Sequence, residues 1–325
     1  LNLFLYLSCY FRTQHGGRRS DLFAGYGNSS SNRETGSVSR SDKSDRDQGN
    51  QTDRNGKMIS LLFFGDVFGK AGRQVIFDTL PGLREEFAPD FVIMNGENLA
   101  DGRGLTEKTA KPLLHAGIDV ITGGNHLWDR SESWDFIRSH PNIVKPLNYP
   151  SATPGSSSFT ASRNGKSLTV LSLCGQIYMP PCDSPFTAFD NWMREKTAGN
   201  MAIIVDFHAE STAEKRAFGW HTDGVISAML GTHTHIQTAD EEILPLGTAY
   251  ISDVGMTGAH DSVIGVRKEI ILNKFVNALP SRYESSDKGL QVNAVFLQIN
   301  AQTGRAISIQ RIRRDHFPDI NGGHR

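Results

Sequence analysis

Two histidines separated by a single residue are the first sign of chemistry in this sequence. His233 and His235 belong to the segment Gly-Thr-His-Thr-His at 231–235, which follows a short apolar run at 225–230. The run predicts a strand that leads into a loop, where residues two apart can turn both imidazoles into one cavity. Because imidazole is a common metal ligand, the pair indicates a metal site, and the alternative is two solvated loop histidines. Ligands elsewhere in the chain would decide between the two.

Polar side chains that could bind a metal follow four other apolar runs. The runs at 59–64, 91–94, 120–122 and 201–207 are typical of buried strands. In α/β sheets, binding sites collect beyond the carboxyl ends of the strands. The side chains at these ends are Asp66, Glu97, Asn98, Asn125, His126 and His208. Together with the histidine pair, they form one candidate metal site.

The chemistry of this candidate site follows from its donor atoms, which are oxygens and imidazole nitrogens without thiolate. The set is too large for one tetrahedral ion and suits two ions that share a bridging carboxylate; iron, manganese and zinc all fit such donors. Two ions about 3.5–4 Å apart stabilise the attacking and leaving oxygens of a displacement at phosphorus and lower the pKa of bound water. His126, beside a candidate ligand, is then the natural proton donor for the leaving oxygen.

Strand-like and helix-like segments alternate along the chain and must position these residues. Helices are expected around 75–83, at 106–116, at 133–139, and from Ser211 toward Gly219, where a capping-box pattern opens the segment. Another strand is expected at 168–173, and a hairpin at 292–299 and 306–312 around Gly304. The first half therefore reads as βαβα and the second half as mixed, which predicts an α/β fold.

Composition and charge limit the class of protein. The chain has 325 residues, a formal net charge of −1 and three cysteines. The near-neutral charge gives no general attraction to nucleic acid or to an anionic membrane. Three scattered cysteines argue against a disulfide framework and fit a reducing compartment, so we expect a cytoplasmic protein. No segment has the length and apolar composition of a transmembrane helix.

The first 57 residues differ in composition from the rest. After a short apolar stretch at 1–11, residues 12–57 are rich in Ser, Arg, Asp, Asn and Gly and show almost no apolar periodicity. This composition predicts a disordered or non-native N-terminal extension. A buried-strand pattern begins at once at Met58. We therefore expect a single domain at 58–325.

In chain order, these motifs resemble the calcineurin-like metallophosphoesterase superfamily and, more closely, its YmdB-like branch of bacterial phosphodiesterases. The segments that carry the resemblance are 65–73, 95–98, 124–129, 231–235 and 253–258, together with His208. The resemblance covers Met58 to about Arg313. It implies a β-sandwich flanked by helices, the four-layer metallophosphoesterase fold, with a site for two metal ions along one edge.

The resemblance also implies a role for each residue of the site. One ion would be held by Asp66 and His235, with Asn98 in the same site. The other ion would be held by Asn125, His208 and His233. Glu97 would bridge the two ions, and His126 matches the catalytic histidine of the family. The wider superfamily has a histidine where this chain has Phe68 and an aspartate in place of Glu97, and both departures match the narrower branch. The first site is thereby poorer in nitrogen, which favours iron or manganese over zinc.

The function that the resemblance implies is a phosphodiesterase that opens 2′,3′-cyclic nucleotides. A hydroxide bridging the two metal ions would attack phosphorus, and His126 would donate the proton. One alternative is a phosphomonoesterase of broad specificity, and another is a regulatory RNA-associated protein with a structural metal site. The near-neutral charge disfavours an extensive nucleic-acid surface. The expected partner is therefore a small nucleotide or phosphodiester, and not a membrane. The sequence does not decide whether the chain forms a homo-oligomer.

Overall fold

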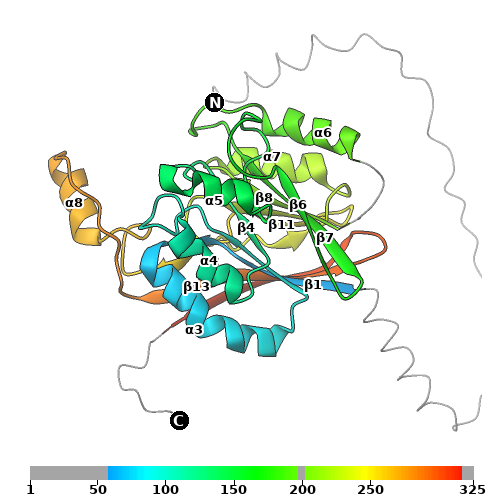
Figure 1. Ribbon diagram of the computed structural model, residues 1–325, viewed down its shortest axis with the longest axis horizontal. Coiled ribbons are helices and arrows are strands. Elements are labelled where there is room, and N and C mark those ends of the chain that lie inside the picture. Colours follow the sequence, from blue (N-terminus) through cyan, green and yellow to red (C-terminus); the bar gives the residue numbers. More distant parts are fainter. Residues whose placement is uncertain (1–57, 197–201, 317–325) are drawn as a thin grey trace, which may run out of the picture. The chain divides into compact units, whose positions relative to one another are not determined.

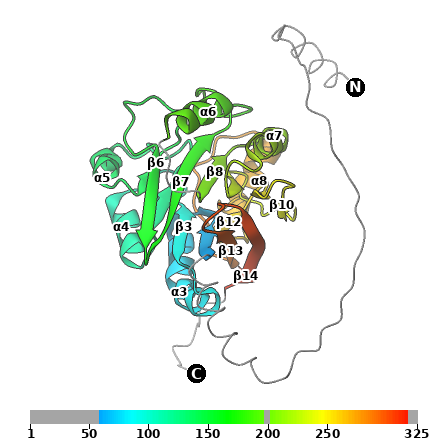
Figure 2. The same ribbon diagram turned by 90° about the vertical axis from the view of Figure 1, so that its right-hand side faces the viewer.

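Two β-sheets packed face to face, with helices on the outer side of each, make up the fold (Figure 1, Figure 2). The computed structural model describes residues 58–196 and 202–316, and the predicted extension at 1–57 lies outside this part. The arrangement confirms the prediction of a β-sandwich flanked by helices in four layers. The single domain expected at 58–325 stays a prediction.

The first sheet has eight strands, and its centre is parallel. The strands are β1 (Met58–Phe64), β2 (Asp66–Val67), β3 (Phe91–Asn95), β4 (Val120–Thr122), β5 (Ile143–Val144), β12 (Met256–Ala259), β13 (Leu290–Asn300) and β14 (Ala306–Asp315). The order is β2-β12-β13-β1-β3-β4-β5, with β14 paired to β13. Strands β1, β3, β4 and β5 are mutually parallel, so their carboxyl ends share one edge of the sheet.

The second sheet has six strands, again with a parallel centre. The strands are β6 (Ser158–Arg163), β7 (Lys166–Cys174), β8 (Ile203–His208), β9 (Ala228–Thr232), β10 (Glu242–Ile243) and β11 (Ala249–Ile251). The order is β10-β11-β9-β8-β7-β6, and β7, β8, β9 and β11 are parallel. The carboxyl ends of β8 and β9 therefore lie side by side.

Six helices lie in the described part of the chain. They are α3 (Gly69–Phe87), α4 (Glu107–His115), α5 (Trp134–Ser139), α6 (Pro185–Glu195), α7 (Thr212–Thr222) and α8 (Lys268–Asn277). The first three pack on the outer face of the first sheet, while α6 and α7 cover the outer face of the second. Among the helices described, none combines the length and apolar character needed to cross a membrane.

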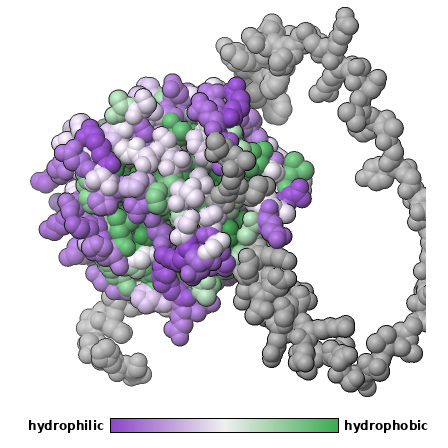
Figure 3. Space-filling view, turned by 45° about the vertical axis from the view of Figure 1, so that its right-hand side comes forward, coloured by the Kyte–Doolittle hydropathy of each residue, from purple (hydrophilic) through white to green (hydrophobic). Residues whose placement is uncertain are grey.

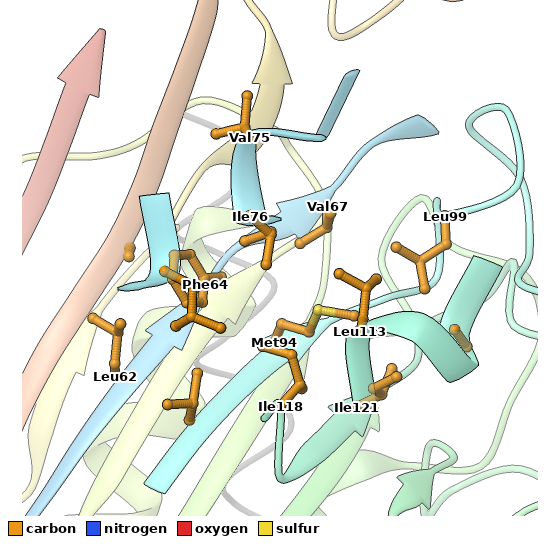
Figure 4. Close-up of a cluster of buried hydrophobic side chains, with 14 of the residues drawn as sticks. Leu62, Phe64, Val67, Val75, Ile76, Met94, Leu99, Leu113, Ile118 and Ile121 are labelled. Atoms are coloured by element: carbon orange, nitrogen blue, oxygen red, sulfur yellow. The ribbon is translucent and has the colours of Figure 1, made fainter. Parts of the chain in front are cut away.

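Side chains along β1 point alternately to the two faces of the sheet, and both faces are buried, which explains why the sequence of β1 is apolar almost throughout. Leu62 and Phe64 point outward and pack against α3 and α4 (Figure 4), whereas Leu61 and Phe63 point inward between the two sheets. All four side chains are fully buried. Burial of each such side chain contributes roughly 1.5–3 kcal/mol relative to exposure, so the strand is held firmly where the site begins.

Most of the predicted elements are present, with shifted ends. The helix expected at 106–116 is α4, and Thr106 precedes it as the N-cap, with its N–H donating to Thr109 Oγ1 at 2.9 Å. The strand expected at 225–230 is wrong in its bounds. Its first predicted residue, Val225, is 45% exposed, and β9 runs from Ala228 to Thr232. The apolar run begins before the strand does, because the pairing of β9 with β8 sets where the strand starts and ends.

Helices α6 and α8 and the short edge strands are absent from the sequence predictions. Helix α8 buries only Ile271, while Phe275 and Val276 are 74% and 78% exposed, so its apolar residues do not mark a single buried face. In Figure 1 it lies apart from the two sheets. On the face drawn in Figure 3, hydrophobic residues form small groups among hydrophilic ones.

Candidate metal centre

The predicted site residues all lie at or just beyond strand ends. Asp66 is in β2, Glu97 and Asn98 follow β3, Asn125 and His126 follow β4, His208 ends β8, and His233 and His235 follow β9. The first sheet thus supplies the carboxylates and amides, and the second supplies the three histidines expected as ligands. The side chains meet where the two sheets bring these ends together.

The tightest group surrounds Nε2 of His208. Asn125 Oδ1, His233 Nδ1 and Glu97 Oε1 each lie 3.1 Å from this nitrogen. The ligand atoms of Glu97, His208 and His233 all lie within 4.8 Å of one another. These are the residues expected around the second ion and the bridging position. Four donors at such separations can surround a single ion.

The group expected around the first ion is looser. Asp66 Oδ1 lies 3.9 Å from His235 Nε2 and 3.9 Å from His208 Nδ1. The side-chain amide of Asn98 donates to the Gly102 carbonyl at 2.9 Å, which leaves its Oδ1 free. In the described part of the chain, Oδ1 of Asp66 and Oδ1 of Asn98 are buried atoms without a hydrogen-bond partner.

Two buried oxygens without partners are costly, because each loses its hydration and gains nothing. A bound cation would remove that cost, and the imidazole Nε2 of His235, 3.9 Å from Asp66 Oδ1, is the neighbouring nitrogen donor. Oxygen and nitrogen donors without sulfur suit iron, manganese or zinc. The residues present therefore fit a metal ion at this position as well as at the tighter group.

Local backbone features allow the side chains to approach so closely. A Cβ on Gly124 would overlap His208 Cδ2 and Glu97 Oε2, so only glycine leaves room there. His233 and His235 have φ angles of 100° and 66°, a region that side-chain-bearing residues seldom adopt. Backbone strain of this kind is stored at functional sites and is held by surrounding contacts.

The charges of Glu97 and His208 stabilise each other. Burial alone would raise the pKa of Glu97, but the charge and hydrogen bond of His208 and the backbone N–H of His126 lower it to about 2. Burial alone would lower the pKa of His208, but Glu97 and Asp66 raise it to about 9. Without metal, the site therefore holds an ionised glutamate beside a protonated histidine.

Asp66 and His233 are shifted in the opposite sense. Burial raises the pKa of Asp66 to about 6, although His235 and His208 oppose the shift. Burial and the charge of His208 lower the pKa of His233 to about 3. His233 is then neutral and its Nδ1 lone pair is available to a metal. The carboxylate of Asp66 carries a charge that no hydrogen bond to Oδ1 compensates.

His126 lies at the edge of the group and not within it. Its Nδ1 is 2.9 Å from Asp129 Oδ2, and its side chain is 26% exposed. Asp129 can hold the proton on Nδ1, which leaves Nε2 as the ring atom that faces other partners. No role for Asp129 was predicted from the sequence, although a carboxylate three residues after His126 is a signal that could indicate one.

Two further residues beside the site, Thr232 and Asp253, lie in the segments 231–235 and 253–258 that carry the resemblance, but the sequence predicted no role for either. Thr232 Oγ1 lies 2.9 Å from His208 Nδ1, and Asp253 Oδ2 accepts from the Thr234 N–H at 3.0 Å. Thr232 belongs to the segment at 231–235, but its role depends on a residue 24 positions away. Such a contact gives no local sequence signal.

Comparison with known proteins places the chain in a family. The family model of YmdB-like proteins matches residues 62–312. A 2′,3′-cyclic-nucleotide 2′-phosphodiesterase of Bacillus subtilis is 46% identical over 254 residues, which are 78% of this chain and 96% of that protein.

Solved structures agree with this placement. A hypothetical protein from Thermus thermophilus superposes with a TM-score of 0.74 at 38% identity, covering 79% of this chain and 99% of that chain. A structure described as a novel phosphatase of Mycoplasma pneumoniae gives a TM-score of 0.75 at 34% identity, covering 79% of this chain and 94% of that chain. The resemblance seen in the sequence is thus confirmed across both sheets. The chain belongs to the YmdB-like protein family.

Proposed function

We propose that this chain is a two-metal phosphodiesterase that opens 2′,3′-cyclic nucleotides by hydrolysis. The coarser assignment, a hydrolase of phosphoric esters, follows from its relatives. The choice of substrate is supported by the Bacillus subtilis relative, whose name specifies a 2′,3′-cyclic-nucleotide 2′-phosphodiesterase. The observation that carries the metal chemistry is the set of three donor atoms 3.1 Å from Nε2 of His208.

The ligand assignment follows the two groups of donor atoms. One ion would be held by Asn125, His208 and His233. The other ion would be held by Asp66, Asn98 and His235. Glu97 would contribute to both positions. Bound ions supply positive charge to the phosphoryl oxygens and make hydroxide available near neutral pH. Iron is our first choice, with manganese or zinc as alternatives, because the Asp66 group is rich in oxygen.

The chain's own residues supply the proton and its orientation. Attack of hydroxide on phosphorus breaks a bond to a ribose oxygen, and that oxygen must take up a proton as it leaves. His126 would donate this proton from Nε2, while Asp129 fixes Nδ1–H and stabilises the imidazolium. The backbone N–H of His126 donates to Glu97 Oε2 at 3.0 Å, so the proton donor is tied to a metal ligand.

A second candidate is a phosphomonoesterase that uses the same donors. The solved structure described as a phosphatase, at 34% identity, favours it. The two functions differ only in whether the site accepts a phosphate with a second ester substituent. They do not differ in the metal ligands or in the proton donor.

The experiment is a metal analysis of the purified protein coupled to a substrate panel. We expect metal to copurify, and we expect 2′,3′-cyclic AMP to be hydrolysed faster than p-nitrophenyl phosphate when iron, manganese or zinc is present. Preference for p-nitrophenyl phosphate would support the phosphomonoesterase instead. No hydrolysis of either substrate by metal-loaded protein would overturn both.

Two variants test whether the proposed ligands carry the activity. Glu97→Ala and His208→Ala should each lose bound metal and turnover together. The matched control is Glu107→Gln, because Glu107 is an exposed glutamate whose partner is Lys111 on the same helix. Turnover that survived in Glu97→Ala or His208→Ala would contradict the metal mechanism.

A further inference from the structure

A buried carboxylate outside the proposed ligand set lies directly behind His208. Asp206 is fully buried in β8, two residues before His208. It accepts hydrogen bonds from Asn95 Nδ2 at 2.9 Å, from Thr122 Oγ1, and from Thr232 Oγ1 at 2.6 Å. These donors come from the ends of β3, β4 and β9. The proposed ligands Glu97, Asn125 and His233 follow the same three strands.

The hydrogen bonds between Asp206, Thr232 and His208 fix the position of a proton. A threonine hydroxyl carries one proton, and a carboxylate can only accept. The proton of Thr232 Oγ1 is therefore directed at Asp206. Toward His208 Nδ1, 2.9 Å away, the same oxygen can only accept, so Nδ1 must carry a proton. The other ring nitrogen, Nε2, is the one that faces Asn125, His233 and Glu97.

We propose that Thr232 and Asp206 are positioning residues that hold His208 in the tautomer with its proton on Nδ1, so that Nε2 binds the metal. This inference rests on the proposed metal site. A hydrogen bond from the outer nitrogen of a ligating histidine fixes the ring and makes the inner nitrogen a stronger ligand. The carboxylate of Asp206 orients the threonine hydroxyl, and it also accepts hydrogen bonds from Asn95 and Thr122.

A purely structural role for the same network is the competing explanation, and the chain offers a matched pair to separate the two. Thr232 and Thr122 are both fully buried and both donate to Asp206, but only Thr232 contacts His208. Valine in place of either removes one hydroxyl from the network at nearly constant shape. Serine at 232 restores the hydroxyl without the methyl group.

The test measures the dissociation constant of the full chain for Zn²⁺ and Mn²⁺ by calorimetry. We expect Thr232→Val to bind about 10–100-fold more weakly than wild type, the usual effect of losing such an outer hydrogen bond. Thr122→Val and Thr232→Ser should stay close to wild type. Equal affinity in Thr232→Val and Thr122→Val would overturn the inference, as would a Thr232→Ser variant as weak as Thr232→Val.

A second measurement needs only the wild-type chain with histidines labelled by ¹⁵N and loaded with Zn²⁺. Long-range proton–nitrogen spectra should show a proton on Nδ1 of His208, with the ring signal assigned through its connection to the backbone resonances of the same residue. Metal bound through Nδ1 would overturn the inference. If the wild type bound neither Zn²⁺ nor Mn²⁺, the proposed function itself would fail. Normal binding with the opposite tautomer would reject only this inference.

Discussion

At the scale of single residues, His126 offers a test of whether proton transfer and metal binding use different side chains. It contacts Asp129 through Nδ1 and Glu97 only through its backbone N–H, so its ring is not needed to hold the ligand group. For His126→Ala we expect bound metal to stay and kcat to fall about 10²–10⁴-fold, the range for a lost proton donor. Metal content and turnover should be measured on the same preparation. Loss of metal along with activity would make His126 a ligand.

The buried charge of Asp66, which suits a metal ligand, should lower the stability of the metal-free chain. In the metal-free chain its pKa is about 6, against 3.8 in the unfolded state, because burial disfavours the charge. The folded state then binds more protons between about pH 4 and pH 6, so stability falls as the pH rises through that window and stays lower above it.

The variant Asp66→Asn removes that charge and keeps the shape. At pH 8 and without metal, we expect it to be more stable than wild type by about 1–3 kcal/mol, since one pKa unit corresponds to about 1.4 kcal/mol. The difference should shrink near pH 4, where Asp66 of the wild type is protonated in the folded state and partly protonated in the unfolded one. Urea unfolding of both proteins in EDTA, at pH 8 and at pH 4, measures this difference in the free energy of unfolding. A less stable variant at pH 8 would contradict the assigned burial cost.

At the scale of elements, a buried ion pair holds the loop that carries the two histidines. Asp253 Oδ2 accepts from Lys215 Nζ at 2.8 Å and from the N–H and hydroxyl of Thr234 at 3.0 and 2.8 Å. Both charged side chains are 1% exposed. Thr234 lies between His233 and His235, so these bonds keep the loop in its strained conformation.

We expect Lys215→Met to destabilise the chain by about 3–5 kcal/mol, because it leaves the Asp253 charge buried and unpaired. The double variant Lys215→Met with Asp253→Asn should recover part of that loss, since it buries no lone charge. Denaturant unfolding in EDTA measures both without any contribution from metal. A double variant no more stable than Lys215→Met would show that the loss does not come from the unpaired charge of Asp253.

The same elements show how far the sequence could predict the structure. Asp66, Asn125 and His208 were found because buried strands have continuous apolar sequences, and the polar residues after them stand out. The strand ends before Asp66 and Asn125 share one edge because their strands belong to the same sheet, which is a general property of parallel strands. His208 ends a strand of the second sheet, so its approach depends on the packing of the two sheets, which no local pattern predicts.

The supporting contacts could not be predicted in this way. Asp206 interrupts an apolar strand and carries no local sign that its partners are Asn95 and Thr122, 111 and 84 residues away. The bounds of β9 depend on its pairing with β8, and the apolar residues of α8 bury only Ile271, so neither apolar runs nor helical periodicity could place these elements.

At the scale of the whole molecule, the two sheets contribute different proposed ligands to one site, so metal binding should couple their stabilities. The first sheet supplies Asp66, Glu97 and Asn125, and the second supplies His208 and His233. An ion held by both sheets binds the folded chain and finds no such arrangement in the unfolded one. Its binding energy therefore adds to the free energy of unfolding.

Metal removal should accordingly lower the melting temperature of the chain as one cooperative unit. At a free metal concentration about 100 times the dissociation constant, binding contributes about 2.7 kcal/mol. For a domain of this size, each kcal/mol shifts Tm by roughly 2–4 °C, so EDTA should lower Tm by about 5–10 °C. His233→Ala should lose this shift, while His115→Gln, on the exposed side of α4, should keep it. A Tm that does not respond to EDTA in metal-loaded wild type would mean that the two sheets are not joined through a metal, and that the close approach of their ligands serves the fold alone.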